Sequence, residues 1–399
     1  MLDVPSVLAA RYRPPQMKIS RTSNGLATAL SRTPVDEKIR VLHFVDSAGA
    51  ADRLWGKENV IVSLMEAQRA SGQIDAELVT FTSGLLDRTM EAAGFRVHAL
   101  DSAHRRLPLR ALAQFRRILA DGEPAVVHTH EYKANIVGRL ARASGAPMRK
   151  LVSTCHGWVD RSVALDAYFA FDRLTAALSD VVTVTDPAMI ARFPAALRPR
   201  RLVFVQNAIS NGPVPGGAER LAARARLGFP PDATVIGSLG RLTKNKGILD
   251  VLAAARRTAG EPIIWAIAGS GALTNDVAQC GLPNVRFVGY QADNAGYLAA
   301  LDVYLQASYF EGLSLSLLES MRAGLPSISS RAGATEMAIR DGSEAMLIDA
   351  GNIDAIVAAA RVLHADAARR ALLAANARAR FDAAFAIERQ HAAFWDLYL

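Results

Sequence analysis

Residues 234–256, TVIGSLGRLTKNKGILDVLAAAR, form the unit from which the fold can be predicted. Thr234–Leu239 is a short apolar run of the kind that forms a buried strand, and Ile248–Arg256 has the periodicity of a helix. A near-continuous apolar strand followed by a helix is typical of a parallel sheet that helices cover on both faces. The segment therefore predicts a doubly wound α/β domain.

The same alternation of strands and helices extends in both directions from this unit. Towards the C-terminus the predicted strands are Ile263–Ala268, Val285–Val288, Val303–Gln306, Ser327–Ser329 and Met346–Ile348. Towards the N-terminus they are Arg40–Val45, Ala76–Phe81, Ala125–Thr129, Leu151–Cys155, Val181–Thr185 and Leu202–Gln206. Gly, Pro and Asn cluster between the two series, in Asn207–Gly217, which we interpret as a linker. We expect two Rossmann-like domains, residues 38–209 and 210–380, that face a central cleft.

Length and composition agree with a globular protein of two domains. The chain has 399 residues, 51% of them hydrophobic and 21% charged, and no apolar run approaches the roughly 20 residues that cross a bilayer. Its two cysteines, Cys155 and Cys280, are far apart, which suits a reducing compartment. Residues 1–37 lack the apolar centre of a secretory signal and are predicted to be a disordered or loosely attached leader. These features predict a cytoplasmic protein.

The formal net charge of +8 indicates acidic partners, either nucleotide phosphates, nucleic acid or an anionic membrane surface. Zinc-finger spacing and an aromatic-basic RNA-binding signature are both missing from the sequence, which disfavours nucleic acid. Arginines also occur in the segment His104–Leu119, where Leu112, Phe115 and Leu119 share one helical stripe. They are Arg105, Arg106, Arg110, Arg116 and Arg117. This segment either contacts anionic headgroups at the inner face of the plasma membrane or packs its stripe on its own sheet.

A basic loop follows the strand of the opening segment. Arg241 and Lys246 lie between this strand and the next helix, where two cations beside helix amides would bind a diphosphate. Lys244 is expected to be solvated, and a merely solvated basic turn is the alternative for the whole loop. Gly240, Gly269 and Gly271 follow strands in the same way, and they either let the backbone approach a nucleotide or only form tight turns.

A second candidate segment runs from Glu311 to Glu319. Glu311 is predicted to lie in a loop and Glu319 about two turns into a helix, roughly 12 Å away along the axis. The amides at the start of this helix would bind phosphate or sugar hydroxyls, and carboxylates accept hydrogen bonds from hydroxyls. These amides belong to Gly312, Leu313, Ser314 and Leu315. Alternatively, the two acids are only a helix-terminal acid and a solvated one.

Two predicted strands of the first domain end in histidines. Val127–His130 and Thr154–Gly157 place His130 and His156 near the same sheet edge, and His128 shares a face with His130. A fourth ligand at a supporting spacing is missing from the sequence, so we do not expect a metal site. His156 is predicted to donate a hydrogen bond at the cleft, although a structural role is open for it and more so for His128.

In this order the segments resemble the GT-B-fold retaining glycosyltransferases of family 4. The resemblance extends from about Ile39 to Leu399 and is most specific across Gly240–Gly247, Ala268–Gly271, Val288–Gly289 and Glu311–Gly342. It implies that Glu311 binds the donor sugar, that Glu319 binds the ribose and that Arg241 and Lys246 hold the diphosphate. It also implies that His156 lines the reaction centre, that no metal or other cofactor is used, and that a final helix, residues 381–399, crosses back to the first domain.

The resemblance is weaker on the acceptor side. The family usually has a Gly-Gly pair and an acid in its first βα loop, whereas here only Gly56 and Glu58 match beside a bulky Trp55. We assign Gly56, Glu58 and His130 to this side. Two further departures, Ala334 and Ser316, do not touch the proposed charge pairs.

The expected function is transfer of a hexose from a nucleotide-diphosphate sugar to a hydroxyl of a saccharide or lipid-linked acceptor, in cell-envelope or exopolysaccharide synthesis. Because a fold does not fix a function, other readings stay open. They are a nucleotide-sugar epimerase or phosphorylase-like enzyme, and a non-catalytic module that binds sugar nucleotides at a membrane surface.

Overall fold

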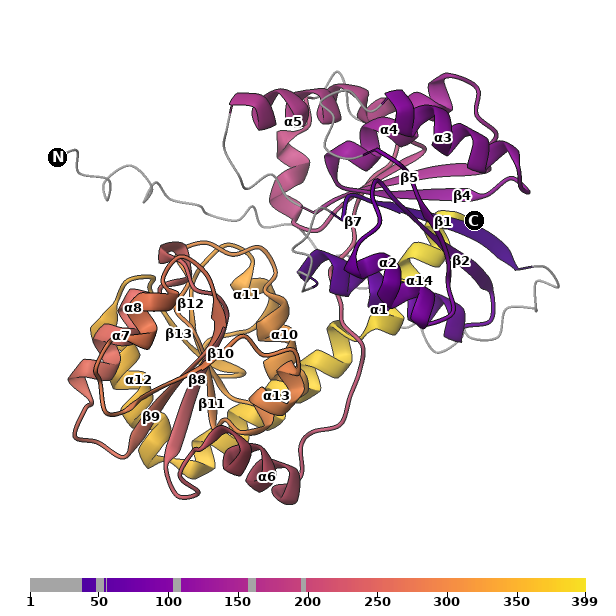
Figure 1. Ribbon diagram of the computed structural model, residues 1–399. Helices are drawn as coiled ribbons and strands as arrows, with labels where there is room; N and C mark the ends of the chain where they lie inside the picture. The colour runs from indigo at the N-terminus through magenta and orange to yellow at the C-terminus, as the bar shows by residue number, and fades with distance from the viewer. Residues whose placement is uncertain (1–37, 48–53, 55, 103–108, 157–162, 195–198) are drawn as a thin grey trace. The chain divides into compact units, whose positions relative to one another are not determined.

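The computed structural model describes residues 38–47, 54, 56–102, 109–156, 163–194 and 199–399. Residues 38–399 form one compact unit in which helices lie on both faces of two parallel sheets (Figure 1). The predicted leader, residues 1–37, and Trp55 lie outside the described residues. In the part of the chain that the structure describes, none of the helices has both the length and the apolar character that a bilayer span requires.

The first sheet has seven strands in the order β3-β2-β1-β4-β5-β6-β7. The strands are β1 (Ile39–Val45), β2 (Ile74–Thr80), β3 (Arg96–Ala99), β4 (Val126–His130), β5 (Lys150–Cys155), β6 (Val181–Val184) and β7 (Leu202–Phe204). The α-helices between them are α1 (Gly56–Ala70), α2 (Leu85–Ala92), α3 (Leu109–Ala120), α4 (Glu131–Ala143) and α5 (Val163–Thr175), with 3₁₀ turns at Ala176–Leu178 and Pro187–Arg192.

The second sheet has six strands in the order β10-β9-β8-β11-β12-β13. The strands are β8 (Thr234–Arg241), β9 (Ile263–Ser270), β10 (Val285–Gly289), β11 (Val303–Gln306), β12 (Ser327–Ser330) and β13 (Ala345–Ile348). The helices are α6 (Gly217–Leu227), α7 (Ile248–Arg257), α8 (Thr274–Ala278), α9 (Asn294–Ala299), α10 (Leu315–Arg322), α11 (Thr335–Ala338), α12 (Ile353–Ala365), α13 (Ala367–Ala384) and α14 (Ile387–Tyr398), and Lys244–Lys246 forms a 3₁₀ turn.

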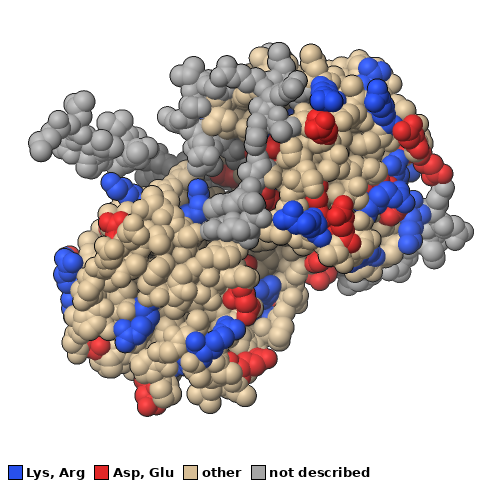
Figure 2. Space-filling view, viewed as in Figure 1, with Lys and Arg blue, Asp and Glu red and all other residues tan. Residues whose placement is uncertain are grey.

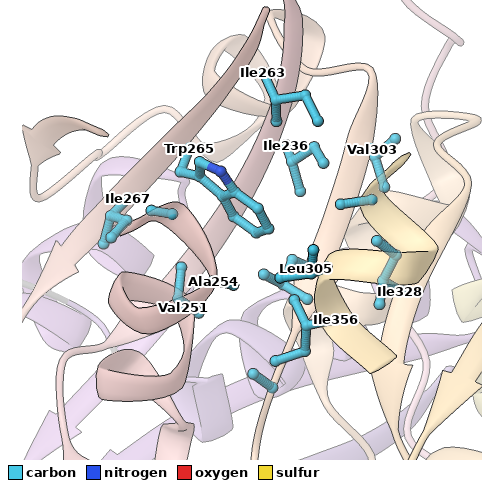
Figure 3. Packing of buried hydrophobic residues seen from close by; sticks show 14 of the residues in the cluster. Ile236, Val251, Ala254, Ile263, Trp265, Ile267, Val303, Leu305, Ile328 and Ile356 are labelled. Carbon is cyan, nitrogen blue, oxygen red and sulfur yellow. The ribbon is translucent and has the colours of Figure 1, made fainter. Parts of the chain in front are cut away.

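The apolar strands of the second sheet are buried on both faces, which confirms the predicted fold class. Ile263, Trp265 and Ile267 of β9 point into one core, and the alternate residues Ala266 and Ala268 point into the other. Figure 3 shows the first core, in which the Trp265 ring lies among aliphatic side chains of the sheet, of α7 and of α12. Such two-sided burial explains why these strands read as continuous apolar runs rather than as alternating ones.

All twelve predicted strands are present, with ends within two residues of their predicted positions. The strand β3 was not predicted. It pairs only with β2, at the edge of its sheet, and none of its four residues is buried. An edge strand with this exposure has no apolar run that could mark it in the sequence.

The last helix, α14, packs against α1 (Figure 1). Its Phe394, Leu397 and Tyr398 belong to the same core as Val41 of β1 and Ile61 of α1. The C-terminal segment therefore contributes side chains to the core that packs against the first sheet. The division of the chain at residues 209 and 380 stays a prediction.

The predicted arginine-rich segment is described only from Leu109 onward, as α3. Phe115 and Leu119 are buried in the core between α3 and the first sheet, with Leu112 packed beside them. Arg110, Arg116 and Arg117 are exposed. The apolar stripe thus packs on its own sheet, as the second interpretation predicted, and only the exposed arginines remain for an electrostatic contact with headgroups.

Candidate functional site

The loops after β8 and β9 approach each other closely, and glycines permit this approach. Gly240 is the register partner of Gly269, and a Cβ on Gly269, whose φ is +133°, would lie 1.8 Å from the carbonyl oxygen of Gly240. A Cβ on Gly247, whose φ is +68°, would lie 2.0 Å from the carbonyl oxygen of Ala307. Side chains at these positions would force the loops apart. The glycines therefore allow these loops to pack closely against each other.

Lys246 and Glu311 form an ion pair between two of these loops. The Lys246 Nζ lies 2.6 Å from Glu311 Oε1, and the Ser308 hydroxyl donates a hydrogen bond of 2.7 Å to the same oxygen. The backbone N–H of Tyr309 also donates to the carbonyl of Asn245, which ties the two loops together. Glu311 is 8% exposed, so its carboxylate is held at a fixed position. Lys244 is exposed, as predicted.

The helix α10 begins at Leu315, with Ser314 as its N-cap. Glu319 therefore lies about one turn into the helix, and the predicted two turns were wrong because the loop before the helix is longer than expected. Asn294 of α9 donates hydrogen bonds of 3.3 Å and 3.1 Å to the two oxygens of Glu319. Burial raises the pKa of Glu319 above its ordinary value. Both predicted acids thus have defined polar partners.

These loops border a cavity of about 570 Å³. Ten of the predicted site residues line it, namely Gly56, Gly240, Arg241, Lys246, Gly269, Glu311, Leu313, Ser314, Leu315 and Glu319. Among the described residues the lining does not include Gly271, Gly312, Glu58, His130 or His156. A volume of this size suits a small-molecule ligand.

Other lining residues were not predicted from the sequence. They include Ser238, Tyr290, Gln291, Asn294, Tyr304 and Ser308. Tyr290 follows β10 directly and is 47% exposed. The Tyr304 hydroxyl donates a hydrogen bond of 2.8 Å to Ser316, at the start of α10. The only signal for these residues is their position within or shortly after a predicted strand or near the start of a helix, which many other residues share.

The histidines of the first sheet form a buried hydrogen-bonded network. Two of its contacts join His43 Nδ1 to His130 Nε2, at 3.1 Å, and His130 Nδ1 to His156 Nε2, at 3.2 Å. His128 is bonded instead to the Tyr398 hydroxyl and to Thr154, each at 2.7 Å. His130 is 1% exposed, so its ring nitrogens face other histidines and not an open surface. The sequence interpretation missed His43.

Nitrogens of His43, His128 and His130 lie within 4.8 Å of one another, a spacing that three ligands of one metal ion could have. Each of these rings, however, has both nitrogens in hydrogen bonds, to one another or to His156, Gln68, Tyr398 and Thr154. Such a fully hydrogen-bonded set is suited to holding protons at fixed nitrogens.

Glu131, directly after His130, was also missed. Its φ is +75°, in the left-handed region that residues other than glycine rarely adopt, and it is the first residue of α4. Burial raises its pKa, while the charge of Lys57 lowers it. Strained backbone of this kind is often found at functional sites. Glu58, which the sequence assigned to the acceptor side, is buried in the first turn of α1.

Two family models match the chain. Residues 219–380 match the model described as glycosyl transferases group 1, and residues 56–208 match the glycosyl transferase 4-like domain. Together the two matches cover most of the described residues.

Individual known proteins are similar over different shares of the chain. The lipopolysaccharide core biosynthesis glycosyltransferase LpsE of Rhizobium meliloti is 36% identical over 123 residues, which are 29% of this chain and 35% of LpsE. The UDP-Gal:alpha-D-GlcNAc-diphosphoundecaprenol alpha-1,3-galactosyltransferase of Escherichia coli is 24% identical over 240 residues, 56% of this chain and 62% of that enzyme. The chain thus spans less than two thirds of both relatives.

Solved structures share the fold over a larger part of the chain. Anabaena HepE in complex with UDP has a TM-score of 0.76 and 18% sequence identity, and the match covers 90% of this chain and 99% of HepE. The same protein has been crystallised with UDP-glucose, and that structure has a TM-score of 0.74 at 19% identity over 90% of this chain and 98% of the other.

Proposed function

The chain belongs to the glycosyltransferases with the GT-B fold, and on this premise we propose that it transfers a hexose from a UDP-sugar to a hydroxyl group of a saccharide or lipid-linked acceptor. We further propose that the configuration at the anomeric carbon is retained. HepE, which shares the fold, has been crystallised with UDP-glucose, and this supports the choice of donor. The names of LpsE and of the galactosyltransferase support an acceptor that belongs to a cell-surface polysaccharide.

The observation that carries the proposal is the wall of the cavity after β8 and β11. Arg241, Lys246 and the start of α10 lie on this wall together with Glu311. A diphosphate needs cations and backbone N–H donors, and a sugar needs fixed acceptors for its hydroxyls. The wall offers cations and backbone donors for a diphosphate and a carboxylate for sugar hydroxyls. The cation Lys246 pairs directly with the carboxylate of Glu311. Lys246 can thus contact the phosphate end of a nucleotide sugar while it orients Glu311 towards the sugar end.

In the proposed reaction the bond between the anomeric carbon and the diphosphate oxygen breaks, and its electron pair stays on the diphosphate. Arg241, Lys246 and the α10 amides stabilise the charge that develops there. The acceptor oxygen bonds to the anomeric carbon on the face that the diphosphate leaves, and the acceptor proton passes to a phosphate oxygen. Glu311, oriented by Ser308 and Lys246, holds the sugar hydroxyls during this step.

The nucleoside is proposed to lie towards α9 and the end of β10. Glu319, held by Asn294, would accept hydrogen bonds from the ribose hydroxyls. Tyr290 and Gln291 line the cavity beside Asn294, and an exposed aromatic ring is a suitable surface for a base. The acceptor is proposed to bind on the side of Gly56, Glu58 and the histidines.

A donor screen tests the proposal. UDP-, GDP- and ADP-sugars are compared by thermal shift, since a ligand at 100 times its dissociation constant stabilises a protein by about 2.7 kcal/mol. The donor that stabilises the protein is then incubated with saccharide and lipid-linked acceptors in excess EDTA, and the product is analysed for its anomeric configuration. We expect a UDP-sugar, activity without divalent ions and a retained configuration. Inversion, or restoration only by Mg²⁺, would contradict the mechanism.

A further inference from the structure

Three histidines, His43 of β1, His130 of β4 and His156 after β5, form a chain of hydrogen bonds that we call the histidine relay. At its inner end His43 Nε2 lies 2.8 Å from Oε1 of Gln68, a fully buried residue of α1. The amide nitrogen of Gln68 donates to the Tyr398 hydroxyl, at 3.1 Å. The relay therefore begins at the Gln68 amide, whose oxygen and nitrogen have different partners. It ends at His156, which is partly exposed.

The hydrogen bonds of the relay have a direction. An amide oxygen only accepts, so His43 Nε2 is the protonated nitrogen. In a neutral ring the other nitrogen then accepts, so His43 Nδ1 receives the Nε2–H of His130. By the same step His130 Nδ1 receives the Nε2–H of His156. The Nδ1 of His156 is left as an acceptor.

The rings of the relay are neutral, because their surroundings lower the pKa of each histidine. Burial lowers the pKa of His43 to about 4 and that of His156 to about 3, with the positive charge of Lys57 adding to the effect at His156. Burial, followed by the neighbouring His128, lowers the pKa of His130 well below its ordinary range. Among the described residues, the titratable groups that act on the relay are Lys57 from α1, His128 from β4 and, through Gln68, Tyr398 from α14.

We propose that Gln68, held by Tyr398, fixes the tautomer of His156 through His43 and His130, so that His156 offers an unprotonated Nδ1 to a substrate hydroxyl. Gln68 and Tyr398 are then positioning residues for the reaction centre. The result reverses the donor role that the sequence predicted for His156. The role in catalysis rests on the proposed function, whereas the tautomer itself does not.

The tautomer can be observed directly by NMR of the full chain with ¹⁵N-labelled histidine at pH 7.5. Protonated and unprotonated ring nitrogens have distinct shifts, and the signals of His156 are assigned from their loss in His156→Gln. We expect His156 to carry its proton on Nε2. A proton on Nδ1 would mean that the Gln68 amide has the opposite orientation, and it would overturn the proposal.

A variant of Gln68 tests whether this residue fixes the tautomer of His156. Gln68→Met keeps the size of the side chain but cannot hydrogen bond, so His156 should change to a mixture of tautomers. In turnover assays kcat should fall about tenfold with an unchanged KM for the donor. The matched control is Gln390→Met, because Gln390 is a buried glutamine of α14 whose side-chain oxygen has no hydrogen-bond partner among the described residues.

If Gln68→Met and Gln390→Met give the same His156 spectrum as the wild type, the relay does not set the tautomer and the proposal fails. If Gln68→Met does not fold, Tyr398→Phe takes its place, because it removes only the hydroxyl that holds Gln68 and that also contacts His128. If the tautomer changes but no sugar is transferred by the wild type, the relay stands and the proposed function fails.

Discussion

Lys246 and Glu311 are 65 residues apart in the sequence, yet their side chains form an ion pair of 2.6 Å on the wall of one cavity. The pair joins the basic loop after β8 to the acidic loop before α10. It also means that a change to Lys246 alters Glu311, since the largely buried carboxylate would lose its cation.

We expect Lys246→Ala or Arg241→Ala to lower turnover by about 10²–10³, because each removes a cation from the charge that develops on the leaving diphosphate. Lys244→Ala is the matched control, since Lys244 lies in the same loop but does not line the cavity. Steady-state rates with saturating donor are the measurement. Wild-type rates in Lys246→Ala and Arg241→Ala would show that this loop does not bind the diphosphate.

Glu319→Gln should raise KM for the donor by roughly tenfold and leave kcat almost unchanged, because ribose hydroxyls are bound equally in the ground state and the transition state. Asn294 would still contact the new amide, so the helix should keep its position. Glu336→Gln is the control, since Glu336 pairs with Arg331 at the surface. A loss in kcat at constant KM would assign Glu319 to the reacting centre instead.

The buried histidines should make the protein sensitive to mild acid. His43 has an ordinary pKa of 6.5 when unfolded and about 4 in the folded protein. Its contribution to stability is therefore complete above pH 6.5 and is lost as the pH falls towards 4, by about 2 kcal/mol at pH 5 for this residue alone. The raised pKa of Glu131 has the opposite sign and offsets part of this loss.

Urea unfolding at pH 7.5 and pH 5.0 measures this effect. Both pH values lie above the pKa of carboxylates in the unfolded chain. Glu77, whose folded pKa is about 2, therefore contributes little to the change in stability between them. His43→Gln should show a smaller loss of stability between the two pH values than the wild type. An equal loss in both proteins would mean that His43 is not the neutral buried group that the structure indicates.

Binding to anionic membranes should be electrostatic, because Phe115 and Leu119 of α3 are buried in the protein core and cannot insert. Figure 2 shows basic and acidic side chains interspersed on the visible face, and not one large basic patch. We expect co-sedimentation with anionic vesicles at low salt and its loss at high salt. If the wild type stays in the supernatant, or if Arg116→Glu with Arg117→Glu binds equally, α3 is not a membrane contact.

The sequence predicts most of this fold because its strands are buried on both faces and therefore remain visible as apolar runs. It also predicts several cavity-lining residues that follow strands or begin helices, such as Lys246 and Glu311. It does not reveal that these two pair with each other, because the pairing depends on how two loops pack. Gln68 and Tyr398, 330 residues apart, meet only after α14 has packed on α1, so no local pattern could mark their contact.

The central claim is that the cavity binds a nucleoside diphosphate through Arg241 and Lys246, and calorimetric titration with UDP and UMP tests it most directly. The wild type should bind UDP at least tenfold more tightly than UMP, since the second phosphate adds charge-assisted contacts. The preference should disappear in the double variant Arg241→Ala with Lys246→Ala and persist in Lys244→Ala. Equal affinities in the wild type, or an unchanged preference in the double variant, would contradict the account.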